Sequence, residues 1–206
     1  VESGMWKSAT DRTPYHTIYM NGHLSPELRD ETRLLKKFTK GTGVYGAEIR
    51  VGGFSGMLCE TLVLFYRSLE RTLQEATRWR NGTIIDLENH YRGDLEEIRN
   101  LFDEPLIVID PVDKVRNLAA AVRQERLWEF VSASRLFLHK PSTRFFYPPR
   151  PKMMAAREFS KALSQRKTSL IGIQFGRLKA PVDVIWSQMY KTEKSLVNLM
   201  RSKDFQ

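Results

Sequence analysis

Apolar residues recur at spacings of three and four along several stretches of the chain, and this pattern predicts helices with one buried face. The clearest helix begins at Ser25, which can cap a helix, and Pro26, which suits the first helical position, and it ends at Gly41. The same spacing predicts further helices at 57–79, 95–102, 124–138, 152–164 and 182–200.

Strand patterns are fewer. Residues 44–51 (VYGAEIRV) alternate with a period of two, which predicts a strand that ends at the glycines of GGFSG. Residues 106–109 (LIVI) are typical of a short buried strand. Beyond this strand, Asp113 is expected to cap a helix over 114–122. A last strand is predicted within 168–178 (TSLIGIQFGRL).

Proline marks two further segments. Residues 12–21 (RTPYHTIYMN) are expected to be extended, because a proline biases the residue before it away from helix. Residues 144–152 (RFFYPPRPK) combine prolines with basic and aromatic residues, which favours a domain boundary. The chain is therefore predicted to have a predominantly helical α+β fold, with a helical domain at 1–140 and a partial second domain at 141–206.

Composition and charge narrow the classes of partner. Of the 206 residues, 41% are apolar, which is typical of a folded chain. Lys and Arg number 33 against 24 Asp and Glu, so the net charge is 33 − 24 = +9. Such an excess favours a polyanion as partner, since it concentrates phosphates near the surface. The charged surface of a thermophilic protein is the alternative explanation.

Other classes find no support in the sequence. There is no run of about 18 uncharged apolar residues and no apolar signal core in VESGMWKSATDRT, so we expect a cytoplasmic protein without membrane contact. The single cysteine, Cys59, lies in the apolar stretch MLCETLVLFY and is predicted to be a core residue. No Cys/His spacing is typical of a zinc site.

Candidate catalytic carboxylates are also weak. Capping explains Asp113 in DPVD better than a metal site shared with Asp110 does. The D-x-E motif at Asp86 and Glu88 has polar surroundings and is expected to be a solvated loop. No P-loop, G-x-S-x-G motif or supported Cys/His dyad is present. We therefore predict no catalytic residue and no metal ligand in this chain.

What remains is a set of side chains suited to phosphates and bases. His16 lies between two tyrosines, Lys36 and Lys37 lie near a helix end, Tyr45 lies on the predicted strand, and Arg116 lies in the first turn of a predicted helix. Each alone is most simply a packed or solvated residue. Their grouping favours a function.

Three motifs carry a resemblance to a known family. RTPYHTIYM, DETRLLKKFTKGTGVYGAEIRVGGFSGMLCETLVLFY and PLIVIDPVDKVRNLAAAV, in this order, resemble the middle region of the archaeal CCA-adding enzymes, the class I tRNA nucleotidyltransferases. In that family a head with a Gly-Ser loop and paired catalytic carboxylates precedes a helical central domain, an RNA-binding body with an RNP-like sheet, and a tail. The resemblance implies that 1–140 is the central nucleotide-binding domain and 141–206 the start of the tRNA-binding part, without the head.

The resemblance also implies roles for single residues. By similarity, Thr13 and His16 reach the triphosphate of the incoming CTP or ATP. Lys36 and Tyr45 add phosphate contacts, with the neighbouring Lys37 as the alternative to Lys36. Arg116 reads the base edge together with the backbone of the tRNA end.

The implied reaction is template-independent addition of CCA to tRNA. The tRNA 3′-hydroxyl attacks the α-phosphorus, and two Mg²⁺ ions, which the head would bind, assist. The implied partners are the tRNA acceptor stem, CTP and ATP, a head domain in cis or in trans, and a second copy in a homodimer. A non-catalytic RNA-binding or scaffold protein, or one subunit of a split enzyme, is the alternative. The chain alone is expected to be inactive.

Overall fold

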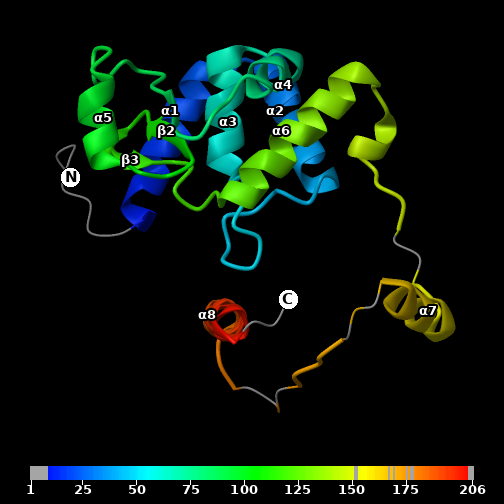
Figure 1. The fold of residues 1–206 in the computed structure, drawn as a ribbon. Coiled ribbons are helices and arrows are strands. Elements are labelled where there is room, and N and C mark those ends of the chain that lie inside the picture. Colours follow the sequence, from blue (N-terminus) through cyan, green and yellow to red (C-terminus); the bar gives the residue numbers. More distant parts are fainter. Residues whose placement is uncertain are drawn as a thin grey trace. The chain divides into compact units, whose positions relative to one another are not determined.

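The computed structural model describes residues 9–150, 153–166, 168, 170–174, 176 and 179–203. The chain divides into two compact units, Val1–Pro148 and Pro149–Gln206. The functional division that the sequence suggests at residue 140 stays a prediction. Figure 1 shows the course of the elements.

Helices dominate the described residues, with one small sheet, which confirms the predicted α+β class. The elements are η1 (Ala9–Arg12), α1 (Thr13–His23), α2 (Pro26–Gly41), α3 (Gly56–Tyr66), α4 (Leu69–Ala76), β1 (Thr83–Ile85), α5 (Leu95–Leu101), β2 (Leu106–Asp110), β3 (Asp113–Asn117), α6 (Gln124–His139), η2 (Thr143–Phe145), α7 (Ala156–Arg166) and α8 (Val182–Ser202). Helices α2, α5, α6 and α8 agree closely with the helices predicted from the sequence.

Capping side chains explain where several helices begin. The hydroxyl of Ser25 accepts a hydrogen bond from the Leu28 amide at 3.3 Å, as predicted for α2. The predicted helix over 57–79 is wrong as a single element, because Arg67 adopts a left-handed conformation (φ 73°) after α3. Ser68 then caps a separate helix, α4, by accepting from the Arg71 amide at 3.1 Å.

The strand predicted at 44–51 is also wrong. The backbone turns within it, and Tyr45 forms a single bridge with Phe54 instead of a ladder. Gly46 and Gly52 have φ values of 126° and 61°, which only glycine adopts at little cost. Gly53 passes so close to the chain that a Cβ there would collide with the carbonyl oxygen of Val44. Alternation predicted the strand, but the glycines close a loop.

Two further predictions, the extended segment at 12–21 and the helix over 114–122, are also wrong. Residues 12–21 are not extended: they lie mostly in α1, where Pro14 occupies the first turn and its missing N–H costs no hydrogen bond. Asp113 begins β3 instead of capping a helix. The side chain of Asn117 fixes this strand, since its Oδ1 accepts from the amides of Val108 at 2.8 Å and Ala119 at 2.9 Å. Arg116 therefore lies on a strand.

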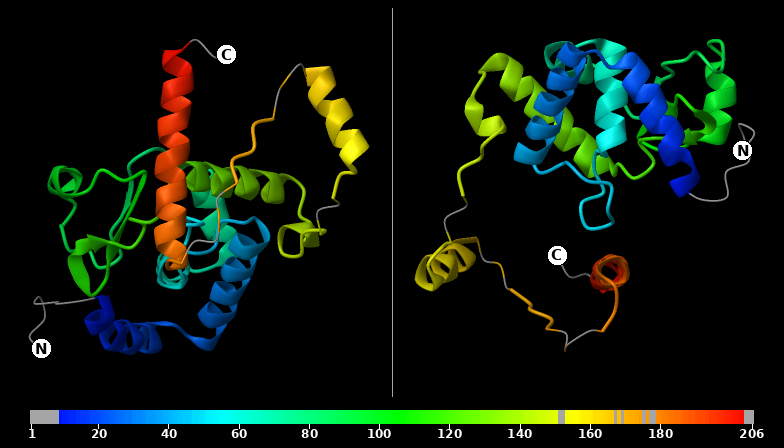
Figure 2. Two further views of the ribbon diagram at one scale, coloured as in Figure 1. Left: turned by 90° about the horizontal axis from the view of Figure 1, so that it is seen from below. Right: turned by 180° about the vertical axis from the view of Figure 1, so that it is seen from behind.

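The sheet has the order β1-β2-β3. Strand β1 runs parallel to β2, and β3 runs antiparallel to β2. All five residues of β2 are buried, as expected of its apolar run. Helices α2 and α3 pack together, as do α4 and α6, and the fully buried rings of Phe38, Phe54 and Phe130 lie among them. Figure 2 shows α1 and α2 as successive helices joined by a short connection.

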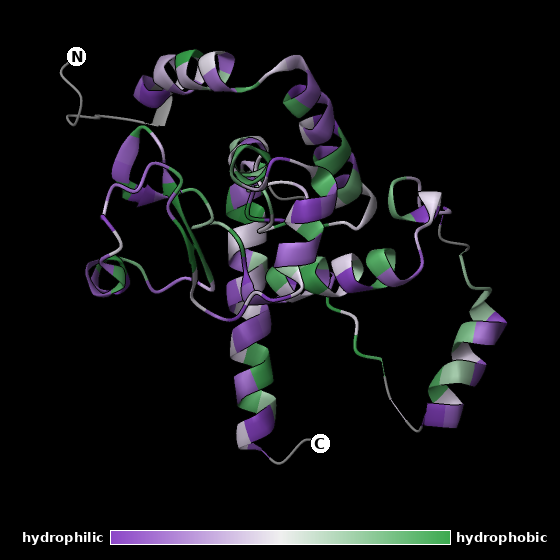
Figure 3. Cartoon of the chain, turned by 90° about the horizontal axis from the view of Figure 1, so that it is seen from above, coloured by the Kyte–Doolittle hydropathy of each residue, from purple (hydrophilic) through white to green (hydrophobic). Residues whose placement is uncertain are grey.

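The second unit contains α7 and α8. Apolar and polar residues alternate along α8, as the hydropathy colours of Figure 3 show, and its apolar residues include the exposed Leu199. The strand predicted within 168–178 is wrong for 168, 170–174 and 176, which have no regular secondary structure. The other residues of that prediction lie outside the described part.

Burial of the one cysteine gives a testable expectation. Cys59 on α3 has no exposed surface, and this burial raises the pKa of its thiol to about 12. We expect a disulfide-exchange reagent at pH 8 to label Cys59 at least about 100-fold more slowly in the native protein than in urea, because the thiolate is the reacting form. Stopped-flow absorbance measures both rates. A cysteine introduced by Ser132→Cys on the exposed side of α6 is the control, and equally fast native labelling of both thiols would contradict a buried Cys59.

Candidate functional site

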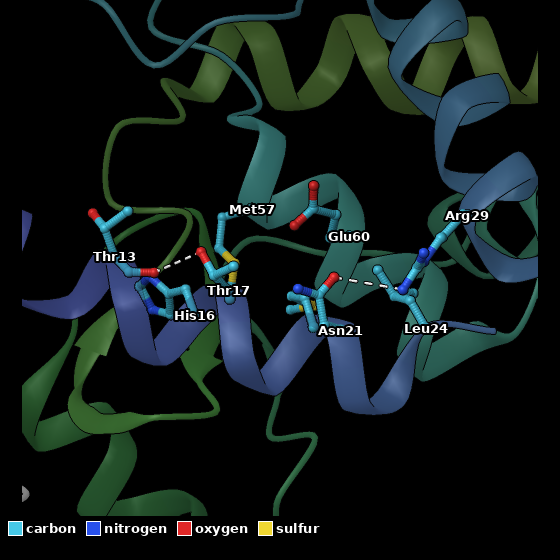
Figure 4. Close-up of a pocket in the computed structure, with 9 residues that line it drawn as sticks. Thr13, His16, Thr17, Asn21, Leu24, Arg29, Met57 and Glu60 are labelled. Atoms are coloured by element: carbon cyan, nitrogen blue, oxygen red, sulfur yellow. Dashed lines mark hydrogen bonds between the residues drawn. The ribbon is translucent and has the colours of Figure 1, made fainter. Parts of the chain in front are cut away.

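A cavity of about 520 Å³ lies between α1, α2 and α3. Figure 4 shows Thr13, His16 and Thr17 on α1, with Met57 and Glu60 of α3 facing them. The cavity is lined by Thr13, His16, Thr17, Met20, Asn21, Leu24, Arg29, Met57 and Glu60. Two of the predicted phosphate-binding residues, Thr13 and His16, thus line one pocket.

A buried carboxylate connects this pocket to the sheet. Asp110, at the end of β2, has no exposed surface, and its Oδ2 lies 2.8 Å from Nε2 of His16. The same oxygen accepts from Nη1 of Arg116 on β3 at 3.1 Å, and Oδ1 accepts from the amide of Val112 at 3.0 Å. Charged partners compensate the cost of burying this carboxylate. Asp110 therefore joins the residue predicted to bind phosphate, His16, to the one predicted to read the base, Arg116.

Both partners keep atoms for a ligand. Because Asp110 engages Nε2 of His16, Nδ1 is the ring nitrogen left for a ligand. Arg116 uses one terminal nitrogen on Asp110, and its side chain is 37% exposed. Besides the contact between His16 and Asp110, an ion pair joins Nε of Arg12 to Oδ2 of Asp113 at 2.6 Å. Two pairs thus hold the start of α1 against the β2–β3 hairpin.

Lys36 and Tyr45 meet at the first turn of α3. A Cβ on Gly56 would lie 3.4 Å from the Tyr45 hydroxyl oxygen and 3.6 Å from Nζ of Lys36, so both donors border the same small space. Nζ of Lys40 lies 4.7 Å from the centre of the Tyr45 ring. This corner of the fold therefore combines two ammonium groups with a hydroxyl, a set suited to phosphate oxygens.

The two neighbouring lysines have different surroundings. Nζ of Lys36 lies 2.6 Å from Oε1 of Glu60, which lines the large cavity. Nζ of Lys37 instead lies 4.1 Å from the centre of the Tyr147 ring. Lys36, and not Lys37, thus contacts a residue that lines the large cavity.

The five predicted residues form two groups, and Thr13 and His16 are the two that line the large cavity. His16 and Arg116 meet through Asp110, with Thr13 near His16, whereas Lys36 and Tyr45 meet beside Gly56. Asp110 was predicted neither as a contact nor as a link, although its place at the end of a buried strand could have indicated one. Nothing in the sequence indicated Glu60.

The described residues do not fit a magnesium site. They contain no cluster of three or more His, Cys, Asp or Glu side chains that could hold a metal ion. The carboxylates of Asp110 and Asp113 face cationic side chains. The D-x-E motif is also divided, since Asp86 accepts from the Tyr91 amide and Glu88 from the Tyr19 hydroxyl.

None of the helices in the described part of the chain combines the length and apolar character needed to cross a membrane.

The comparisons assign the family. Residues 30–147 match the model of the second domain of tRNA nucleotidyltransferases, so this chain belongs to that family. Over 204 residues it is 45% identical to the CCA-adding enzyme of Methanothermobacter thermautotrophicus. The aligned region covers 99% of this chain and 43% of that protein. The chain is 39% identical over 212 residues to the CCA-adding enzyme of Methanopyrus kandleri, and the aligned region covers 100% of this chain and 43% of that protein. It is 38% identical over 199 residues to the CCA-adding enzyme of Sulfurisphaera tokodaii, and the aligned region covers 96% of this chain and 44% of that protein.

These relatives confirm the resemblance found in the sequence. They also set its scope, because the chain spans less than half the length of each curated relative that it matches.

The buried link makes a prediction about stability. Asp110→Ala leaves His16 and Arg116 without their shared partner, so we expect the free energy of unfolding to fall by about 3–5 kcal/mol. Urea unfolding followed by tryptophan fluorescence measures it. Asp30→Ala is the matched control, since Asp30 pairs with Arg33 at the surface with 71% of its side chain exposed, and we expect little change there. Equal small effects of the two substitutions would show that the Asp110 link carries no stability.

Proposed function

We propose that this chain supplies the nucleotide-binding and part of the tRNA-binding surface of a CCA-adding enzyme, which adds CCA to tRNA 3′ ends from CTP and ATP. The observation that carries the proposal is that Thr13 and His16 line one cavity, while Lys36, beside Tyr45 at the first turn of α3, lines the adjoining one. These residues come from distant parts of the sequence. Their donors are of the kinds that bind phosphate oxygens.

The triphosphate would lie along α1 toward α3. At the α1 side of the pocket, Thr13 offers a hydroxyl, and Nδ1 of His16 donates to a phosphate oxygen when the ring is the imidazolium. Lys36 supplies a compact positive charge, and Tyr45 a hydroxyl on a rigid ring.

Arg116 would select the base. Its guanidinium carries a fixed fork of donors, one of which Asp110 already engages. The remaining donors can meet the acceptors that cytosine and adenine present on their edges. In the proposed enzyme the tRNA end completes this contact, which replaces a nucleic-acid template.

The reaction itself needs groups that the described residues do not provide. The tRNA 3′-hydroxyl would attack the α-phosphorus of CTP or ATP, and pyrophosphate would leave. A head domain, in cis or in trans, would contribute the carboxylates and Mg²⁺. The contribution of this chain is to bind and orient the nucleotide, the acceptor stem and, in a homodimer, a second copy. A cytoplasmic location follows from these substrates.

The two adjacent lysines allow a matched test of nucleotide binding. We expect Lys36→Ala to weaken CTP and ATP binding about 10- to 100-fold, because a charged hydrogen bond to phosphate is lost. Lys37→Ala, which removes the same charge next to Tyr147, should change binding less than about twofold. Isothermal titration calorimetry measures both. Equal effects of the two substitutions would mean that net charge, and not this pocket, binds the nucleotide.

Turnover provides the second test. We expect this chain alone to incorporate no radiolabelled CTP or ATP into tRNA that lacks its 3′ end, because the described residues contain no group of three or more His, Cys, Asp or Glu side chains that could hold a metal ion. In the complete enzyme, Arg116→Ala should lower incorporation of both nucleotides at least about tenfold while the enzyme stays folded. Because Arg116 is one partner of the buried Asp110, its loss also lowers the melting temperature, so both enzymes are assayed well below that of the variant. Incorporation by the chain alone would overturn the division of labour proposed here.

A further inference from the structure

An acidic side chain lies inside the pocket proposed to bind a polyanion. Glu60 lines the large cavity with His16 and Thr13, and it also lines the neighbouring cavity of about 170 Å³ with Lys36 and Arg29. A carboxylate at this place repels a phosphate, so it opposes the function proposed for its surroundings. Neither the phosphate contacts nor the base contact uses it.

The carboxylate of Glu60 and the ammonium of Lys36 form a close ion pair. Oε1 of Glu60 lies 2.6 Å from Nζ of Lys36, and the two side chains are 25% and 27% exposed. Partial burial makes this pair stronger than a surface pair, yet enough water reaches it for the pair to open. Glu60 lies on α3 one helical turn after Gly56. The ammonium group of Lys36 that it binds therefore lies near Gly56, in the small space that the Tyr45 hydroxyl also borders.

We propose that Glu60 is the internal counter-ion of Lys36. When no anion is bound, Glu60 holds the ammonium group at the pocket and balances its charge. A phosphate of the nucleotide takes over Lys36, and the carboxylate turns away to water. This inference rests on the proposed function and adds to it a residue that sets the affinity.

The consequence is a threshold for anions. Opening the Glu60–Lys36 pair costs the same for every ligand. A triphosphate offsets this cost with further contacts at Thr13 and His16, whereas inorganic phosphate at Lys36 has none. Glu60 therefore lowers affinity for all phosphates and leaves useful binding to nucleoside triphosphates and other polyphosphates.

Neutral and charged variants of Glu60 test the counter-ion. In the full chain we expect Glu60→Gln to tighten binding of CTP and of tripolyphosphate, which lacks a base, about three- to tenfold by calorimetry. Glu60→Asp keeps the charge and should stay within about twofold of the original affinity. Glu75→Gln is the control for net charge, because Glu75 pairs with Arg78 outside the cavity, and it should have no effect.

Melting temperatures of all variants show that they are folded, and Glu60→Ala replaces Glu60→Gln if the latter is not. Unchanged or weaker binding by the neutral variant overturns the counter-ion, since Glu60 would then only position Lys36. The Lys36→Ala variant separates this failure from a failure of the proposed function. If Lys36→Ala weakens CTP binding and Glu60→Gln does not strengthen it, only the counter-ion is wrong. If neither substitution changes CTP binding, the nucleotide does not use this pocket.

Discussion

The buried carboxylate of Asp110 is the constraint on which the arrangement of the site depends. A carboxylate with no exposed surface must be compensated, and His16, Arg116 and the Val112 amide do so. These partners come from α1, from β3 and from the turn between β2 and β3. Burying one charge therefore places α1 against the sheet, and with it the pocket wall that α1 forms.

The position of Tyr45 beside Lys36 depends on a close approach of two backbone segments. Because Gly53 has no side chain, the loop can return close to the carbonyl group of Val44. This close approach brings Tyr45 to the first turn of α3. Lys36 reaches the same place from α2 and meets Glu60. The carboxylate that lines the pocket, Glu60, is thus paired with a cation of the protein itself. In the counter-ion proposal, a phosphate of the substrate would take the place of this carboxylate at Lys36.

Local patterns predicted much of the fold. The cap at Ser25 and the apolar spacing were enough for α2, and the run LIVI was enough for β2. Predictions failed where one residue changed the path of the chain. The proline of α1 lies in a first turn, where it does no harm, and the left-handed Arg67 divides one apolar pattern into two helices. The side-chain hydrogen bonds of Asn117 support a strand at Asp113–Asn117, where the sequence predicted a helix capped by Asp113.

The sequence by itself determined the kinds of side chain available for phosphates and bases, the predominantly helical α+β class, and the family through its three motifs. It could not determine which side chains meet, because the polar contacts that decide this join residues far apart in the chain: Asp110 with His16, and Glu60 with Lys36. Only the tertiary structure separated Lys36 from its neighbour Lys37. The physical reason is that adjacent residues on a helix point in directions about 100° apart, so packing, and not composition, selects the one that faces the pocket.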